Sequence, residues 1–234
     1  FMRLNKFLAQ SGVASRRKSD ELIQMATTEV NGKVCLDPAY KVRPDDKVCF
    51  DGKRLVPIKD KVVLMLNKPE KVITTVQDTH GRKTVIDLIR SKIRLSPIGR
   101  LDKNTKGLLL LTNDGTLHQY LTHPSHQIPK DYEAVIEGKL TQDNIIKLKR
   151  GIYIGNKEYG KAEILKQNTI KGRSTIILRL RQGKKREIRR IFFRFKKILY
   201  SLKRIKYAKL TLGNLKEGEY RQLTTNEINS LYDS

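Results

Sequence analysis

The chain has 234 residues, enough for one large domain or two modest ones, and 38% of them are hydrophobic, so a buried core is possible. Lys and Arg number 49 against 24 Asp and Glu, a formal net charge of +25 at pH 7. Such an excess indicates a polyanionic partner, with nucleic acid ahead of an anionic membrane. No apolar run approaches the ~20 residues of a membrane span and no secretory signal is recognised, so we expect a cytoplasmic protein.

The positive charge is unevenly distributed along the chain. Residues 171–209 contain 16 Lys and Arg against a single acid, Glu187. This clustering favours a dedicated nucleic-acid-binding face. A membrane surface is a distant alternative, because no amphipathic helix carries bulky apolar residues opposite its cations and the chain has no Trp.

Metal and cofactor chemistry lacks sequence support. The two cysteines, Cys35 and Cys49, are predicted to be buried free thiols in strands, as in a reducing compartment. Three of the four histidines lie close together around Pro124 but lack the regular spacing and closed ligand set of a zinc motif. Neither glycine-rich nucleotide motif occurs, so we expect no metal and no cofactor.

The N-terminal segment is predicted to begin with two helices. Apolar residues at helical spacing over 4–8 predict the first, which ends near Gly12, and Ser15 is a candidate N-cap for the second. Cations at a helix start oppose the macrodipole, so those in the second helix's first turn are better explained by contact with phosphate. A solvated charge cluster is the alternative. The cations are Arg16, Arg17 and Lys18.

Short strands and a linker follow. The alternating runs over 29–36 and 47–50 predict strands, with Asn31-Gly32 and Asp51-Gly52 as turn signals. Residues 52–61 are polar and lack periodicity, which predicts a linker. Val62 to Leu66 then reads as a buried strand.

The remaining elements alternate without a regular βαβ rhythm. In chain order they are a short helix over 84–89, a central strand over 107–112, a helix from Asp114 that ends before Pro124, a strand over 132–137, a helix over 142–149, a strand over 176–180 with one basic side, and a final helix begun by a Thr224–Glu227 capping box. This order predicts an α+β fold with a largely antiparallel sheet flanked by helices. We assign residues 2–51 to a small αβ domain, 52–61 to the linker and 62–234 to a catalytic domain.

The most informative segment is Gly99-Arg100-Leu101-Asp102-Lys103-Asn104-Thr105-Lys106-Gly107, which leads into Leu108 to Gly115. Asp102 is expected to be ionised, because nearby cations favour the charged form of a carboxyl group. A carboxylate on a loop that feeds a rigid strand can act as nucleophile or base on a sugar ring. A surface ion pair is the alternative.

The N-terminal segment resembles the RNA-binding domain named after ribosomal protein S-four. The matching residues are Arg3 to Leu8, Ser15-Arg16-Arg17, Val30 to Lys33, Lys41-Val42 and Asp45 to Asp51. Ala26-Thr27-Thr28 departs from the pattern, because the family usually has an Arg there. The resemblance implies that RNA contacts Lys6, Arg16, Arg17 and Lys18.

The second part resembles the bacterial ribosomal pseudouridine synthases of the Rsu type. The segment Gly99 to Gly115 matches the signature around that family's catalytic aspartate. Further matches occur in the same order, at Leu66 to Pro69, Lys130 to Tyr132, Gln182 to Arg190 and Leu202 to Thr224. With the N-terminal module, the resemblance covers nearly the whole chain.

The resemblance implies a site in which Asp102 acts on the ribose of a flipped-out uridine. It also implies the following roles: Tyr132 stacks on the base, Arg189 pairs with Asp102, Ile188 packs against the uracil, Arg100 fills the gap in the RNA stack or contacts phosphate, Lys130 supports Tyr132 or binds phosphate, and Arg186 and Arg190 contact phosphates. Whether the aspartate attacks the anomeric carbon or removes the neighbouring sugar proton stays open.

The leading hypothesis is a pseudouridine synthase that acts on ribosomal RNA, with the large subunit favoured, either free or within a pre-ribosomal particle. The alternative is a non-catalytic RNA-binding or ribosome-assembly protein with the same fold. We expect a monomer that needs neither metal nor cofactor.

Overall fold

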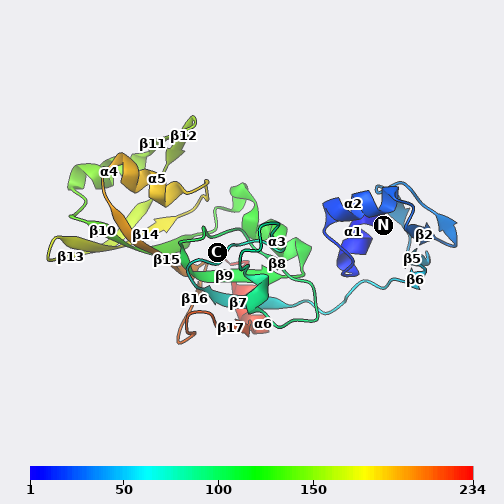
Figure 1. Ribbon diagram of the computed structural model, residues 1–234. Helices are drawn as coiled ribbons and strands as arrows, with labels where there is room; N and C mark the ends of the chain where they lie inside the picture. The colour runs from blue at the N-terminus through cyan, green and yellow to red at the C-terminus, as the bar shows by residue number, and fades with distance from the viewer. Residues whose placement is uncertain (234) are drawn as a thin grey trace. The chain divides into compact units, whose positions relative to one another are not determined.

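The computed structural model describes residues 1–233 and divides into two compact units. The first comprises residues 1–61 and 92–94, and the second comprises residues 62–91 and 95–234. Figure 1 labels the elements of both units. The α+β fold class predicted from the sequence is confirmed.

The first unit packs two helices on short strands around a small core. Ser15 caps the second helix, because its Oγ accepts a 3.2 Å hydrogen bond from the Lys18 backbone N–H. Leu4, Leu8 and Ile23 are fully buried between the helices and strands. The elements are β1 (Met2–Arg3), α1 (Leu4–Gln10), α2 (Arg16–Gln24), β2 (Thr28–Val30), β3 (Lys33–Val34), β4 (Lys41–Val42), β5 (Val48–Phe50) and β6 (Lys53–Arg54). Strands β3, β2, β5 and β6 form one antiparallel sheet, and β1 pairs with β4.

The predicted linker is structured at its start. Lys53 and Arg54 form β6, which pairs with β5, and the Ile58 N–H donates to the Gln10 carbonyl at 3.0 Å. The linker prediction over 52–61 is therefore wrong for this part, because composition alone does not reveal that a polar strand extends a sheet edge. Both cysteines are free and Cys49 lies in β5, as predicted, whereas Cys35 lies outside the strands and both residues are half-buried rather than buried.

A nine-stranded sheet organises the second unit (Figure 1). The path is β13 (Glu163–Ile170), β14 (Arg173–Leu180), β10 (Lys130–Glu137), β15 (Leu199–Tyr207), β9 (Lys106–Thr112), β7 (Val63–Lys68) and β17 (Tyr220–Gln222). Two further strands join at its side, β8 (Ser96–Pro97) on β9 and β16 (Leu210–Thr211) on β15. Among the strand pairs of this sheet that the structure describes, only β15–β9 is parallel. The sheet therefore consists of two antiparallel parts joined along one parallel seam.

Each antiparallel part has its own core and its own helices. One core lies where β7 and β9 pack with α3 (Gly115–Thr122) and α6 (Thr225–Ser230). The other lies where β10 and β14 pack with α4 (Gln142–Arg150) and α5 (Glu187–Arg194). Asp114 caps α3, and the Thr224–Glu227 capping box begins α6, as predicted. The remaining elements are the short helices η1 (Ile86–Leu88) and η2 (Pro124–His126) and the hairpin of β11 (Ile152–Gly155) and β12 (Glu158–Gly160).

The parallel seam demands a glycine. Gly107 pairs with Arg204 across it and has a φ of +107°. A Cβ at this position would lie 2.2 Å from the Arg204 carbonyl oxygen, far inside any allowed contact. The strand that leaves the Asp102 loop can therefore approach β15 only because residue 107 has no side chain.

Candidate active site

Asp102 lies on the loop between β8 and β9, five residues before the seam glycine. The loop closes through a hydrogen bond from the Thr105 N–H to the Asp102 carbonyl, at 3.0 Å. Thr74 secures its entry, because its Oγ1 donates to the Leu101 carbonyl at 2.8 Å and accepts from the Leu101 N–H at 3.3 Å. The Asp102 side chain stays 37% exposed. The backbone is thus fixed while the carboxylate remains accessible.

A buried lysine organises the same loop from below. Lys68, the last residue of β7, is fully buried, and the three N–H donors of its Nζ are shared among four backbone carbonyls. Their distances are 2.9 Å to Pro69, 3.3 Å to Asp102, 3.3 Å to Lys103 and 3.0 Å to Thr105. Burial lowers the pKa of Lys68 to about 8, against the opposing charges of Glu70, Asp102 and Glu217. Loop carbonyls therefore take the place of a buried counter-ion.

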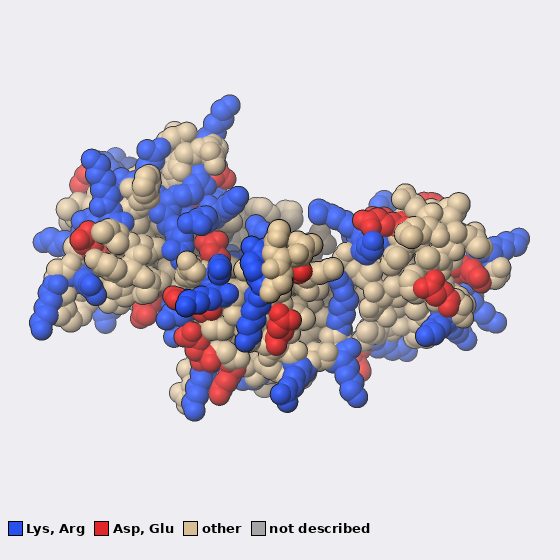
Figure 2. All heavy atoms as spheres, in the orientation of Figure 1, with Lys and Arg blue, Asp and Glu red and all other residues tan. Residues whose placement is uncertain are grey.

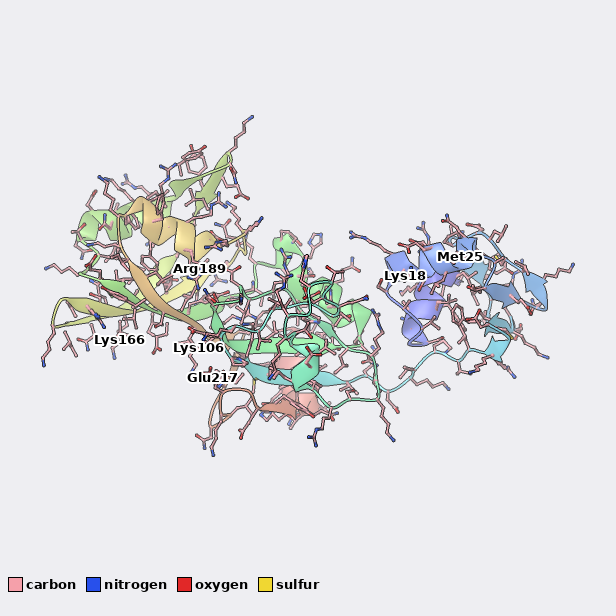
Figure 3. All side chains as sticks on the ribbon, viewed as in Figure 1. Lys18, Met25, Lys106, Lys166, Arg189 and Glu217 are labelled. Carbon is pink, nitrogen blue, oxygen red and sulfur yellow. The ribbon has the colours of Figure 1, made fainter. Side chains whose placement is uncertain are left out.

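Arg189 of α5 approaches the loop from the other antiparallel part of the sheet (Figure 3). Its Nε lies 3.6 Å from Asp102 Oδ2, which makes an ion pair without close hydrogen-bond geometry. Its Nη2 donates to the Asn104 carbonyl at 2.7 Å and to Thr105 Oγ1 at 3.2 Å. One guanidinium thus places a positive charge beside the carboxylate and hydrogen-bonds the loop that carries it.

The start of α5 is built around a buried carboxylate. Glu187 is 3% exposed and accepts from the Lys184 N–H at 3.0 Å, the Lys161 N–H at 3.3 Å and Gln182 Nε2 at 2.6 Å. Burial raises the pKa of Glu187, although these hydrogen bonds favour its charged form. Arg186 precedes the helix in the left-handed conformation, with a φ of 52°, and its side chain is exposed. The single acid of the basic stretch therefore shapes the turn that carries Arg186.

Arg190 and Ile188 have surroundings different from those expected. Arg190 is engaged by protein oxygens: Nε donates to the Ile154 carbonyl at 2.9 Å, Nη2 to the Gly155 carbonyl at 2.7 Å, and Nη1 pairs with Glu158 at 2.5 Å. These contacts join the β11–β12 hairpin to α5. They occupy most of the guanidinium donors, so few are available for a phosphate. Ile188 is 5% exposed within the core beneath β10 and β14, which leaves little of it to face a uracil.

Tyr132 lies on β10 beside a second buried cation. Arg204 of β15 is 2% exposed, and its Nη1 lies 3.5 Å from the Tyr132 hydroxyl oxygen. Arg204 Nε donates to the Leu108 carbonyl on β9 at 2.7 Å. Lys130 precedes Tyr132 by two residues, and its Nζ donates to the Ile128 carbonyl at 2.9 Å. Through Arg204, strand β15 thereby connects Tyr132 on β10 with Leu108 on β9, the strand that follows the Asp102 loop.

A cavity of about 970 Å³ opens beside these residues. Gly99 and Arg100, from the start of the Asp102 loop, share its lining with Lys130, Tyr132 and Arg204. The other cations in the lining are Lys149, Lys161, Arg179, Arg181 and Lys184, and Glu163 is its acid. In Figure 2, Lys and Arg gather over the region of α5 and the β11–β12 hairpin. A cavity and surface of this kind suit a polyanion.

The cations predicted in the first unit are all exposed. Lys6 lies on α1, and Arg16, Arg17 and Lys18 form the first turn of α2. Lys18 also pairs with Glu21 at 2.7 Å, with both side chains more than half exposed (Figure 3). Solvent screening makes such a pair weak, so it leaves Lys18 able to contact an anion.

Sequence reasoning did not identify Lys68, Thr105 and Arg204 as parts of the site. Lys68 falls in the matched segment Leu66 to Pro69, and its signal was a cation at the end of a strand that is otherwise buried. Arg204 had a similar signal, as a cation with alternating apolar neighbours on a central strand. Among residues 1–233, no group of three His, Cys, Asp or Glu side chains is placed to hold a metal ion, and no helix is long and apolar enough to cross a membrane.

Known families match both units. Residues 62–193 match the family described as RNA pseudouridylate synthase, and residues 2–48 match the S4 domain. The ribosomal large subunit pseudouridine synthase B of Bacillus subtilis strain 168 is 40% identical over 232 residues, which are 98% of this chain and 95% of the relative. The dual-specificity RNA pseudouridine synthase RluF of Escherichia coli K12 is 31% identical over 233 residues, 99% of this chain and 78% of the relative.

A solved structure agrees with these matches. The crystal structure of a pseudouridylate synthase superposes with a TM-score of 0.70 at 26% identity, covering 99% of this chain and 100% of that one. The matches favour an enzyme over the non-catalytic RNA-binding protein that the sequence left open. The chain therefore belongs to the RsuA/RluB/RluF family of RNA pseudouridine synthases with an N-terminal S4 domain, the enzymes that isomerise uridine in RNA.

Proposed function

We propose that this enzyme converts a uridine of large-subunit ribosomal RNA to pseudouridine, with Asp102 acting on the ribose. The observation that carries the catalytic assignment is the loop itself. An accessible carboxylate sits on a backbone fixed by Lys68 and Thr74, with the Arg189 guanidinium 3.6 Å away. Such preorganisation holds a reacting group in place without reorganisation during the reaction. The large-subunit assignment is supported by the name of the 40% identical relative.

The reaction is an isomerisation, so its atoms balance without an added reactant. The bond from N1 of uracil to C1′ of the ribose breaks, the base rotates, and a bond from C5 to C1′ replaces it. The C5 hydrogen is lost as a proton and N1 gains one. Asp102 begins this sequence either by attacking C1′ or by removing the C2′ proton, with the Arg189 guanidinium beside its carboxylate in either step.

Tyr132 and Arg100 accommodate the flipped base and the gap that it leaves in the RNA. The target uridine must leave its stack, at a cost of a few kcal/mol. Arg100 lies two residues before Asp102 and is exposed at the rim of the cavity, which suits a side chain that fills the vacated position or contacts the neighbouring phosphate. Tyr132 is half-buried, with its hydroxyl group directed at Arg204, and offers its ring to the flipped base.

The test is release of tritium from 5-tritiated uridine in precursor ribosomal RNA transcripts. We expect release from a large-subunit transcript by the wild type and none by Asp102→Asn, together with loss of one pseudouridine from ribosomal RNA in a deletion strain. Release only from small-subunit RNA or transfer RNA would overturn the substrate assignment. Full release by Asp102→Asn would overturn the role of the aspartate. A kinetic isotope effect with deuterium at C2′ would identify proton removal as the step that Asp102 performs.

A further inference from the structure

Two neighbouring cations of the second unit, the buried Arg204 and the half-buried Lys130, have no acidic partner among the described residues. Arg204 is 2% exposed, and its Nη2 atom, which has no solvent access, has no hydrogen-bond partner within the described chain. Neither Arg204 nor Lys130 forms an ion pair with a carboxylate among residues 1–233. An unpaired buried guanidinium is costly, because burial removes its hydration and nothing replaces all of it. Such a feature indicates a site that is completed by a ligand.

The two cations also repel each other across one aromatic ring. The Lys130 Nζ lies 5.4 Å and the Arg204 Cζ 5.1 Å from the centroid of the Tyr207 ring. Tyr207 is fixed from behind, because its hydroxyl group donates to the Leu121 carbonyl at 3.0 Å. An aromatic face offsets only part of the cost of a desolvated cation. Burial and the charge of Arg204 lower the pKa of Lys130 to about 8, which is consistent with a missing anion.

The surrounding cavity restricts the chemistry of that anion. Both residues line the cavity of about 970 Å³, together with six further cations and one acid. One of those cations, Arg179, is already neutralised by a bidentate pair with Asp131 at 2.7 and 2.9 Å. The remaining lining still has a clear excess of positive charge. A backbone phosphodiester has two non-bridging oxygens, one of which can accept from the ammonium and the other from the guanidinium. The polyanionic strand that carries it matches the remaining cations of the lining.

We propose that Lys130 and Arg204 form a phosphate subsite that receives one backbone phosphate of the RNA strand next to the flipped uridine. The inference rests on the proposed function and deepens it, because it assigns the position at which the strand is held. Arg204 also contacts the Tyr132 hydroxyl oxygen at 3.5 Å, a length at which the hydrogen bond is weak and easily exchanged for a phosphate oxygen. Occupancy of the subsite is thereby coupled to the placement of the Tyr132 ring.

The experiment measures RNA binding without turnover, in the Asp102→Asn background, with a short RNA in which single phosphates are replaced by neutral methylphosphonates. We expect one replacement close to the target uridine to weaken binding about 10-fold, and Lys130→Met to weaken binding of the unmodified RNA by a similar factor. The two changes together should be no worse than either alone, because they remove the same contact. Arg204→Lys combined with the same methylphosphonate should likewise be no worse than either change alone. A lysine keeps the charge but lacks the guanidinium group that can donate two hydrogen bonds to one phosphate.

A matched control is Lys166→Met, the same substitution at an exposed lysine of β13 that lies outside the cavity lining (Figure 3). It should keep the full effect of every methylphosphonate. Full additivity of Lys130→Met with each replacement would overturn the proposal. The proposal would also be overturned if inorganic phosphate raised the thermal unfolding temperature of the protein while no methylphosphonate weakened RNA binding. The ligand of the subsite would then be free phosphate rather than RNA.

This experiment is separate from the test of the proposed function. The short RNA is taken from whichever transcript releases tritium, and its binding to the Asp102→Asn variant is measured, so the result does not depend on which RNA proves to be the substrate. If large-subunit RNA releases no tritium but one methylphosphonate still weakens binding, the substrate assignment is wrong and the subsite stands. If large-subunit RNA releases tritium but no methylphosphonate weakens binding, the subsite is wrong and the substrate assignment stands.

Discussion

The Asp102 loop and the first turn of α2 use positive charge in opposite ways. At the loop, the ammonium of Lys68 is fully buried and all its hydrogen bonds go to backbone carbonyls. At α2, Arg16 and Arg17 are exposed and contact solvent. Buried charge fixes geometry at a cost in desolvation, whereas exposed charge supplies affinity and is screened by salt. Substitutions in the two places should therefore affect different observables.

The largest effect is expected at the carboxylate. Asp102→Asn keeps the shape of the side chain but cannot act as nucleophile or base, so turnover should fall by about 10³-fold or more. RNA affinity should stay within about threefold, because the exposed cations that supply it are unchanged. Tritium release and a filter-binding titration measure the two quantities on the same protein. Equal losses of turnover and of RNA affinity would contradict the idea that buried charge fixes the site while exposed charge supplies affinity.

Gly107→Ala should give the next largest effect, on stability. The added Cβ would meet the Arg204 carbonyl oxygen at 2.2 Å in a backbone with a φ of +107°. We expect the free energy of unfolding of the second unit to fall by about 3 kcal/mol. Gly172→Ala is the control, because a Cβ there meets no atom within 4 Å although its φ is also positive. Equal losses from the two variants in urea titrations would mean that backbone conformation, not the seam, sets the cost.

Lys68→Met should cost about 2 kcal/mol of stability, because carbonyls of the loop lose their donor. Turnover should fall with it, since the backbone that carries Asp102 loosens. Lys106→Met is a matched control: Lys106 is only partly buried, and its pair with Glu217 spans 3.9 Å (Figure 3). That change should cost less than about 0.5 kcal/mol. Chemical denaturation followed by circular dichroism checks both values.

Combined Arg16→Ala and Arg17→Ala should weaken RNA binding about 10-fold and reduce the slope of log Kd against log salt by about 1. The unfolding curve of the second unit should not change. Lys53→Ala with Arg54→Ala removes the same number of exposed cations from β6 of the same unit and is the control. If both pairs change the slope equally, net charge rather than the α2 turn accounts for binding.

The smallest expected effect concerns pH. Lys68 has a pKa of about 8 in the folded protein against 10.5 when exposed, so between these values the unfolded chain binds more protons. The free energy of unfolding should therefore rise with pH, by about 1 kcal/mol from pH 7 to 9, relative to Lys68→Met. Urea titrations of both proteins at pH 7, 8 and 9 measure this difference. A difference that stays constant from pH 7 to 9 would show that the pKa of Lys68 is not lowered in the folded protein.

Local patterns were sufficient for most of the fold. Caps at Ser15, Asp114 and Thr224, alternation along β10 and the apolar run of β9 each depend on neighbours in sequence, so they could be recognised without the structure. The parallel seam could not be predicted in this way, because its partners Gly107 and Arg204 lie nearly a hundred residues apart. The same limit explains why β6 was taken for linker.

The site was predictable where a motif marked a residue and not where its role came from distant partners. Asp102, Tyr132 and Arg189 were assigned from matched segments and their roles stay predictions; the structure places the Arg189 Nε 3.6 Å from the Asp102 carboxylate. Arg190 looked equivalent to its neighbours in sequence, yet its guanidinium is occupied by the β11–β12 hairpin. Only the fold distinguishes a cation that is available to RNA from one that is already bound.

The distance along the chain between the two sides of the seam has a consequence during synthesis. The first unit lies almost wholly within residues 1–61, and a ribosome releases it early. Asp102 acquires its partner Arg189, and the following strand its neighbour Arg204, only after some ninety to one hundred further residues have emerged. The S4 domain is therefore synthesised well before the two residues of the Asp102–Arg189 pair can meet. We expect chains interrupted before residue 189 to retain the RNA-binding domain and to lack this pair.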